Sequence, residues 1–382
     1  MAPSPTGYMH LGNAWSFLMA WLSVRQKNGT MVLRMEDIDP DRAKPHYMDA
    51  LIQDLTWLGL DWDEGPAEGF SSSTASQNNE FCSAIQQNSS PHAPYVQSQC
   101  SELYIAVLNY LASHGHSYPC FCTRKELRAM AGAPHLGEAC VYTGTCRHLT
   151  LAEQEERMAQ GRKACIRLRC PDETIAFVDG RCGAQHISLT DCGGDFAIRR
   201  SDGVFAYQLA VVIDDMRMGI TEIVRGDDLL HCTPRQIFLQ SLLGQAGHEL
   251  DFLPPSNNSD QVSIPSYVHI PLLLDVEGER FAKRHASLTI QSLREAGIPA
   301  SCVLGYLAHL AGFIDSYKPL TAYELIPYFD VQRLPKSALR LLHDPFQTML
   351  RLCEQGAFVG HKCRTLSPVS LACEAYGPVL NV

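Results

Sequence analysis

The sequence predicts an α/β protein with a doubly wound parallel sheet, because helical and extended patterns alternate along the chain. Apolar residues recur with a helical period over residues 12–29, where Arg25 and then Gly29 mark the end. The apolar run that follows, residues 30–37, ends in charged residues and predicts a buried strand. A second helix is expected from residue 47 to a stop at Gly59. Helix, strand and helix in succession are the first evidence for the fold class.

The alternation continues after a cysteine-containing interruption at residues 120–146. The later elements expected from apolar pattern are a helix over 101–115, strands over 202–215 and 220–230, a helix over 233–244 and a helical piece over 338–346. Thr233 is the expected N-cap of its helix, with Pro234 at the first helical position. The Ser-, Asn- and Gln-rich segments 70–93 and 257–263 are expected to be loops.

Composition excludes several classes of protein. The chain has 382 residues, 46% of them hydrophobic and 19% charged, which is ordinary for two or three globular domains. A net charge of −10 excludes a generally basic surface, so any RNA contact must come from a local patch. No apolar stretch reaches the roughly 18 residues of a membrane span, and the first residues lack the basic region of a signal peptide. We therefore expect a cytoplasmic protein whose fifteen cysteines are mostly free thiols.

The segment TGYMHLGN, residues 6–13, is a candidate phosphate-binding loop because it leads into the first helix. The first turn of a helix has unpaired N–H groups and a positive dipole end, and both attract phosphate. Gly7 and Gly12 allow close approach of the backbone, and His10 can donate to a phosphate oxygen. The same segment also fits a turn before a core helix with a surface histidine.

Charged residues recur where strands are expected to end. Glu36 and Asp37 end the first strand, and Arg225 and Asp227 end a later one, at the edge where α/β sheets bind ligands. Lys283 follows another apolar run and can neutralise charge on a triphosphate. Such charges are also common on solvated surfaces, so each position is a hypothesis.

Cysteines are candidate ligands for a structural zinc ion. Cys120, Cys122 and Cys146 supply three thiols of the four ligands that zinc prefers. The spacing leaves three candidates for the fourth ligand: Cys140, His148 and Tyr142. A chain with fifteen cysteines can also contain such a pattern by chance.

Four motifs resemble, in order, the signatures of class I aminoacyl-tRNA synthetases in their glutamyl form. They are PSPTGYMHLGN, RMEDIDPDR, the run from residue 205 to residue 244, and RFAKRHA. The resemblance covers roughly residues 1–315, apart from the two polar segments. Only about a hundred residues follow Lys283, and the cysteine segment resembles the zinc site of the shortened paralogues, the glutamyl-queuosine tRNA(Asp) synthetases.

The resemblance implies a Rossmann-type parallel sheet with an inserted zinc-containing subdomain and a helical C-terminal part. The expected organisation is a first half of a nucleotide-binding domain (1–105), an RNA-contacting insertion (106–195), the second half (196–255), a lysine-signature and helical connecting region (256–330) and a tail of unknown role (331–382).

The resemblance also implies a ligase function. The expected reaction is ATP-dependent activation of glutamate to glutamyl-adenylate without tRNA, followed by transfer to the queuosine base in the anticodon of tRNA(Asp). Expected partners are L-glutamate, ATP with Mg²⁺ and the tRNA(Asp) anticodon stem-loop, bound by a monomer with one structural Zn²⁺. The alternatives are a truncated glutamyl-tRNA synthetase that charges a tRNA 3′ end, and a non-catalytic relic that binds tRNA or nucleotide.

Site residues are carried over from the matching motifs. Those implied at ATP are His10, Gly12, Asn13 and Lys283, with His10 and Lys283 catalytic. Those implied at glutamate are Ala2, Ser4, Glu36, Tyr207 and Arg225. The zinc ligands favoured by the resemblance are Cys120, Cys122, Tyr142 and Cys146.

Three positions depart from the family pattern. Ala282 stands where a serine is usual, and Cys100 stands where an arginine is usual. Met1 occupies an aromatic position that the pattern places after a strand and an arginine. Two explanations fit this start. The natural chain begins upstream of Met1, with that strand and arginine restored to the glutamate pocket, which is the explanation we favour; or the chain is a decayed relative with weak or no activity.

Overall fold

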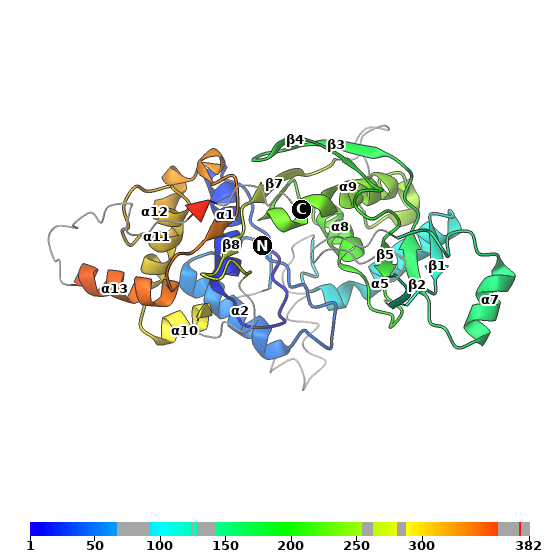
Figure 1. The fold of residues 1–382 in the computed structure, drawn as a ribbon, viewed down its shortest axis with the longest axis horizontal. Coiled ribbons are helices and arrows are strands. Elements are labelled where there is room, and N and C mark those ends of the chain that lie inside the picture. Colours follow the sequence, from blue (N-terminus) through cyan, green and yellow to red (C-terminus); the bar gives the residue numbers. More distant parts are fainter. Residues whose placement is uncertain are drawn as a thin grey trace.

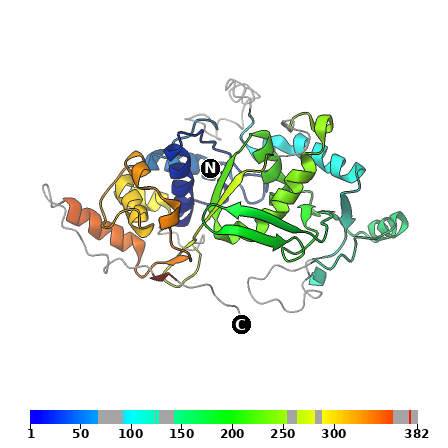
Figure 2. The ribbon, with the colours of Figure 1, turned by 90° about the horizontal axis from the view of Figure 1, so that it is seen from above.

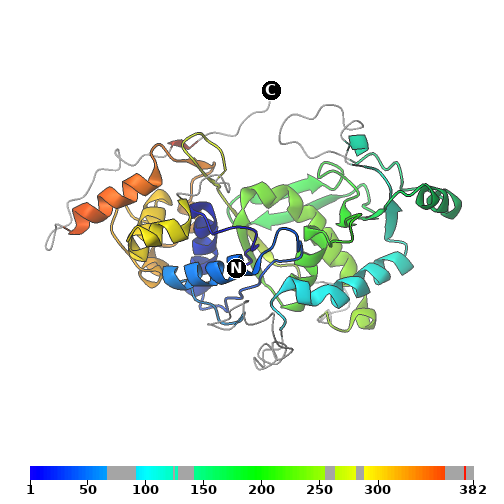
Figure 3. The same ribbon diagram turned by 90° about the horizontal axis from the view of Figure 1, so that it is seen from below.

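The computed structural model describes residues 1–66, 92–123, 125–127, 142–253, 263–280, 288–357 and 374–375. Except for residues 92–93 and 263, the expected polar loops lie outside the described residues. Three groups of elements follow one another along the long axis of the molecule (Figure 1). The N-terminal residues lie between the first group and the second (Figures 1 and 3).

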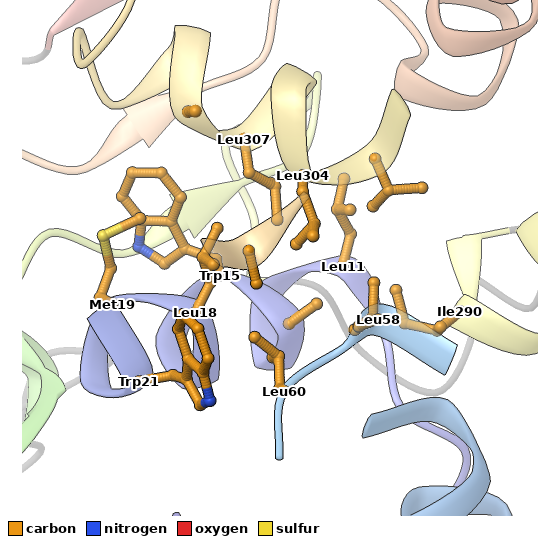
Figure 4. Packing of buried hydrophobic residues seen from close by; sticks show 14 of the residues in the cluster. Leu11, Trp15, Leu18, Met19, Trp21, Leu58, Leu60, Ile290, Leu304 and Leu307 are labelled. Atoms are coloured by element: carbon orange, nitrogen blue, oxygen red, sulfur yellow. The ribbon is translucent and has the colours of Figure 1, made fainter. Parts of the chain in front are cut away.

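Helices make up the first group (Figure 1). They are α1 (Leu11–Gln26), α2 (Pro45–Leu58), α10 (Ile290–Glu295), α11 (Ala300–Leu310), α12 (Ala322–Leu325) and α13 (Pro345–Ala357). Trp15, Leu18 and other apolar residues of α1 pack against Leu304 and Leu307 of α11 in a fully buried core (Figure 4). Gly59 ends α2 in a left-handed conformation, as predicted. Asn28, rather than Gly29, takes the positive φ after α1.

A mixed four-stranded sheet forms the centre of the second group. Its strand order is β4 (Gly183–Ser188), β3 (Thr174–Asp179), β7 (Ser266–Ile270) and β6 (Glu222–Gly226). Strand β7 is parallel to β6 and to β3, whereas β4 is antiparallel to β3. The α/β class is therefore confirmed, but the predicted all-parallel sheet is only partly right. Helix α9 (Thr233–Leu243) packs on β3 and on helix α8 (Tyr207–Arg217) (Figure 2).

The strand expected over residues 202–215 is wrong. Most of this segment belongs to α8, in which residues 209–216 are all buried. A helix that is buried on every side shows a continuous apolar run rather than an amphipathic pattern, and such a run cannot be told from a buried strand. The strand expected over 220–230 is confirmed over residues 222–226 as β6, whereas residues 227–230 belong to a 3₁₀ helix. The helix expected over 101–115 is confirmed as α5 (Ser101–Ser113).

The buried strand expected over residues 30–37 is only partly right: the segment is extended and its residues 31, 33, 34 and 35 are buried, but it forms no regular ladder. Leu33 and Met35 donate backbone hydrogen bonds to Glu64 and Tyr95 on one side. Arg34 and Glu36 donate to Met1 and Pro3 on the other side. The neighbours are short irregular segments rather than strands, so only isolated bridges form. The segment is nevertheless fixed on both edges.

Two further expectations need correction. The N-cap of α9 is Cys232, not Thr233, because a 3₁₀ helix over Asp227–Cys232 continues directly into α9. Pro234 is therefore the second residue of α9 rather than the first. The helical piece expected over 338–346 contains strand β9 (Leu339–Arg340), and helix α13 begins only at Pro345. Strand β9 pairs with β8 (Leu273–Leu274) and β10 (Glu374–Ala375).

The third group holds an antiparallel sheet of β1 (Ser117–Cys120), β2 (Cys165–Leu168) and β5 (Ala197–Arg199). A small core that includes Tyr118, Phe121 and Tyr142 lies beside this sheet. Helix α7 (Leu151–Ala159) has no buried residue and projects at the end of the molecule (Figure 1). None of the helices within the described ranges is long and apolar enough to cross a membrane.

Candidate functional site

A cavity of about 470 Å³ opens where α1, the extended segment 31–36 and the carboxyl end of β6 meet. It is lined by seven of the predicted ATP and glutamate residues: Ala2, His10, Gly12, Asn13, Glu36, Tyr207 and Arg225. Ser4 is exposed and is not among the lining residues. Lys283 falls outside the described residues. Segments far apart in the sequence thus contribute to one site.

The phosphate-loop candidate forms the beginning of α1. His10 is the N-cap: its Nδ1 accepts from the backbone N–H of Asn13 at 3.2 Å, and the Asn13 side chain accepts from the N–H of His10 at 3.3 Å. This capping box fixes the first turn of the helix at the cavity. It also leaves the proton of a neutral His10 on Nε2.

The described residues on both sides of Lys283 reach the same site. Arg280 lines the cavity and forms an ion pair with Asp228 at 2.8 Å. Thr289 forms an isolated bridge with His10. The described residues that precede and follow Lys283 in the sequence therefore both lie at this site, Arg280 at the cavity and Thr289 beside the start of α1.

One wall of the cavity is acidic. Arg34 lies between Glu36 and Asp215, with N–O distances of 3.1 and 2.7 Å, and its Nε is 3.9 Å from Asp214. Asp214 also pairs with Arg217 at 3.4 Å. Three carboxylates thus face two guanidinium groups, which leaves the wall one negative charge in excess when all are ionised.

Burial makes this excess unfavourable. It raises the pKa of Glu36 and of Asp215 above ordinary values, although Arg34 opposes the rise. The Met1 amino group lies among the same residues, and burial followed by Arg34 lowers its pKa to about 5. A ligand ammonium group would balance this wall.

Another part of the cavity lining is a buried arginine, Arg225. Arg225 donates to His269 Nε2 at 3.1 Å, Gln236 Oε1 at 2.7 Å and Thr233 Oγ1 at 2.8 Å. All three acceptors are neutral, and among the described residues no carboxylate lies within ion-pair distance of Arg225. Gly226 keeps the strand end close to Leu272, because a Cβ there would lie 2.9 Å from that side chain. A ligand carboxylate would complete this part of the lining.

The predicted zinc ligands come together in the third group. The Sγ atoms of Cys120, Cys122 and Cys146 all lie within 4.8 Å of one another, and Tyr142 Oη is 3.4 Å from Cys120 Sγ. A hydrogen bond from the Cys165 thiol lowers the pKa of Cys120, which favours the thiolate that a metal needs. Among the other candidates for the fourth ligand, His148 is exposed and Cys140 lies outside the described residues. Three thiols are donors that zinc prefers, and the Tyr142 phenol lies beside them, while burial raises the pKa of the Cys122 thiol.

Sequence reasoning missed several charged residues of the site. Arg34 lies inside the motif RMEDIDPDR, but only its carboxylates were singled out. Asp214 and Asp215 end an apolar run and signal buried charge. His269 stands between apolar residues of β7, a pattern that also describes an inert core histidine.

Comparisons with known proteins agree with this geometry. A family model described as tRNA synthetases class I (E and Q), catalytic domain, matches residues 1–344. A glutamyl-Q tRNA(Asp) synthetase of Nitratidesulfovibrio vulgaris is 50% identical over 340 residues, covering 89% of this chain and 94% of that protein. One of Symbiobacterium thermophilum is 43% identical over 353 residues, covering 92% and 97%.

A solved structure gives the same picture of the fold. A glutamate tRNA ligase from Elizabethkingia meningosepticum, in complex with its amino acid, matches with a TM-score of 0.67 over 93% of this chain and 70% of that chain. At 23% identity this likeness shows the fold alone. The family match and the two relatives confirm the resemblance predicted from the motifs. The chain belongs to the class I tRNA synthetases (E and Q) and is an aminoacyl-tRNA synthetase-like ligase.

Proposed function

We propose that the chain activates glutamate with ATP, without tRNA, and transfers it to the queuosine base in the anticodon of tRNA(Asp). The observation that carries the proposal is that one cavity at the start of α1 is lined both by an acidic cluster and by a buried arginine whose hydrogen-bond acceptors are neutral. The cluster lacks a positive charge and the arginine has no ion-pair partner among the described residues, and a bound acidic amino acid would supply both. The names of the two relatives support the choice of tRNA.

Glutamate would lie between the acidic cluster and Arg225. Its ammonium group would contact Glu36, where the acidic cluster has a carboxylate in excess. The α-carboxylate must remain available to react with ATP. Arg225, together with Tyr207, would therefore hold the side-chain carboxylate. Ala2 lines the same space, whereas a role for Ser4 would require it to approach the cavity.

ATP would bind at the start of α1. We propose that His10, Gly12 and Asn13 contact it and that Lys283, with Mg²⁺, neutralises its phosphates. The α-carboxylate of glutamate attacks the α-phosphate, and pyrophosphate leaves. No protein nucleophile takes part, so the protein contributes positioning and charge stabilisation.

We also propose one structural zinc ion on Cys120, Cys122, Tyr142 and Cys146. Zinc would hold the insertion 106–195, which we propose contacts the anticodon stem-loop. Metal analysis of folded protein is expected to give one zinc per chain. A content well below one equivalent would contradict the zinc proposal and leave the ligase proposal standing.

Transfer of labelled glutamate tests the function. Label is expected on tRNA(Asp) that contains queuosine and not on the same tRNA without it. Label on the 3′ end of tRNA(Glu) would instead support a shortened glutamyl-tRNA synthetase. If glutamate fails to stimulate ATP–pyrophosphate exchange by the wild-type protein, activation itself is contradicted and a non-catalytic binding role is favoured.

A further inference from the structure

We infer that His269 is a positioning residue, oriented by Asp179, that holds Arg225 toward the glutamate site without neutralising its charge. The inference rests on the proposed function, because it explains how the carboxylate-binding arginine is prepared for its ligand. Neither residue lines the cavity, and neither was predicted from the sequence. Both would act through Arg225 rather than through contact with substrate.

The register of the sheet brings the three residues together. Arg225 of β6 and His269 of β7 are paired neighbours in the parallel ladder, so their side chains lie on one face. His269 is fully buried, and Asp179 at the end of β3 is 2% exposed. Arg225 also lies over the ring of Tyr267, two residues before His269 on the same face. The side chain of Arg225 is therefore confined by β7.

Hydrogen bonds determine which ring nitrogen of His269 carries the proton. Asp179 Oδ2 lies 2.6 Å from Nδ1, and Arg225 donates its Nε–H to Nε2 at 3.1 Å. Nε2 must be an unprotonated acceptor, so the proton of the neutral ring is on Nδ1. Burial lowers the pKa of His269 and outweighs the opposing hydrogen bond with Asp179; Arg225 acts in the same direction as burial, and the neutral ring is favoured.

Asp179 is itself held firmly. Its Oδ1 accepts from the backbone N–H groups of Arg181 at 3.0 Å and Cys182 at 2.8 Å. Burial would raise the pKa of Asp179, but the hydrogen bonds from His269, Cys182 and Arg181 lower it overall. An ionised Asp179 fixes the orientation of the imidazole. The imidazole then separates this carboxylate from Arg225.

Neutral hydrogen-bond acceptors position Arg225 and leave its charge available for a ligand. A carboxylate in direct contact with Arg225 would satisfy its charge and compete with the ligand. His269, Gln236 and Thr233 instead fix the guanidinium by neutral hydrogen bonds. One terminal nitrogen of Arg225 donates to Thr233 and, at 3.5 Å, to the Leu229 carbonyl. The other donates to Gln236 and has a second hydrogen, which can still donate to a glutamate carboxylate.

Kinetics of glutamate-dependent ATP–pyrophosphate exchange test the inference. His269→Leu removes the acceptor and is expected to raise KM for glutamate at least about tenfold, since a hydrogen bond to a charged group is lost. KM for ATP should stay within about twofold of the wild-type value, because the lost hydrogen bond affects only glutamate binding. His269→Gln offers an acceptor again and should fall between His269→Leu and wild type.

Val268→Ala is the matched control. Val268 precedes His269 on β7, and its side chain belongs to the buried core that contains Trp15 and Leu304. The substitution therefore weakens the same strand without removing a hydrogen bond of Arg225. Its KM for glutamate should remain that of wild type. Wild-type KM values for glutamate in both His269 variants would overturn the inference, as would equal increases for glutamate and ATP.

A spectroscopic measurement on the wild-type protein tests the inference even when the variants do not fold or when the wild type shows no ATP–pyrophosphate exchange. The ¹⁵N spectrum of the wild-type imidazoles, with His269 assigned by its absence in a variant or by selective labelling, should show the Nδ1–H tautomer. An Nε2–H or doubly protonated His269 at pH 7.5 would overturn the inference. Absence of glutamate-dependent exchange in the wild type contradicts only the proposed function.

Discussion

Arg34 and Arg225 are both buried arginines that line the same cavity, but they are held in opposite ways. Arg34 forms ion pairs with Glu36 and Asp215, and Asp214 lies close by. Arg225 has only neutral hydrogen-bond acceptors among the described residues. The first charge is more than compensated by ion pairs, whereas the second is held by neutral groups and has no ion-pair partner in the described part of the chain.

This difference separates stability from binding. Breaking a buried ion cluster leaves uncompensated charges, so Arg34 belongs to the architecture of the cavity. A buried cation without a counter-ion is unfavourable unless a ligand completes it. Arg225 therefore indicates the charge of the ligand.

Arg34→Met should have the largest effect, and it should be on stability. It leaves Glu36, Asp214 and Asp215 without their shared cation and is expected to lower the free energy of unfolding by about 3–5 kcal/mol. Urea unfolding measures the change. Arg225→Met is the matched variant and should lose less stability, because its partners are neutral. Equal losses in the two variants would remove the distinction between the two arginines.

Arg225→Met should instead act on glutamate. Loss of the ligand's charged partner is expected to weaken glutamate binding by about 2–5 kcal/mol. The measurement is KM for glutamate in ATP–pyrophosphate exchange, with KM for ATP as the internal control. A glutamate KM close to that of wild type would show that the carboxylate is held elsewhere.

Lys283→Ala tests the phosphate side of the site. If the lysine acts on the transition state, its removal is expected to raise the barrier to adenylate formation by about 2–4 kcal/mol. The loss should appear in kcat for exchange and leave glutamate binding unchanged. An unaltered adenylation rate would exclude Lys283 from the mechanism.

The smallest effect expected is a pH dependence that involves His269. Its pKa in the folded protein lies below the ordinary 6.5, because of burial. As pH falls below 6.5, the unfolded chain takes up a proton that the folded chain does not, so stability falls until the folded pKa is reached. The groups around the ring are Asp179, Arg225, Asp227 and Thr233. His269→Gln should lose less stability than wild type between pH 7 and pH 5; an identical loss would contradict this.

Local patterns predicted the parts of the fold that have amphipathic or capped sequences. Helices α1, α2 and α5 show clear periodicity or end signals, and all three are present. Helix α8 was missed because its apolar residues face packing on every side. The antiparallel hairpin of β3 and β4, joined by residues 180–182, was missed because most of its side chains are exposed or half-buried and give no buried apolar run.

The site divides in the same way. Motifs placed His10, Glu36 and Arg225, which all line the cavity. The partners that set their charge state come from other elements: Asp215 from α8 and His269 from β7. These groups come close to Arg34 and Arg225 only in the folded chain. The sequence could therefore identify charged residues of the site but not the net charge around each arginine.

Comparison of glutamate with glutamine tests the central claim most directly. Isothermal titration of both amino acids, to wild type and to Arg225→Met, measures whether Arg225 reads the side-chain carboxylate. Wild type is expected to bind glutamate at least about a hundredfold more tightly than glutamine, and Arg225→Met to lose most of that preference. If Arg225→Met keeps the wild-type preference, the uncompensated arginine does not recognise the ligand's carboxylate, and the account of the cavity is wrong.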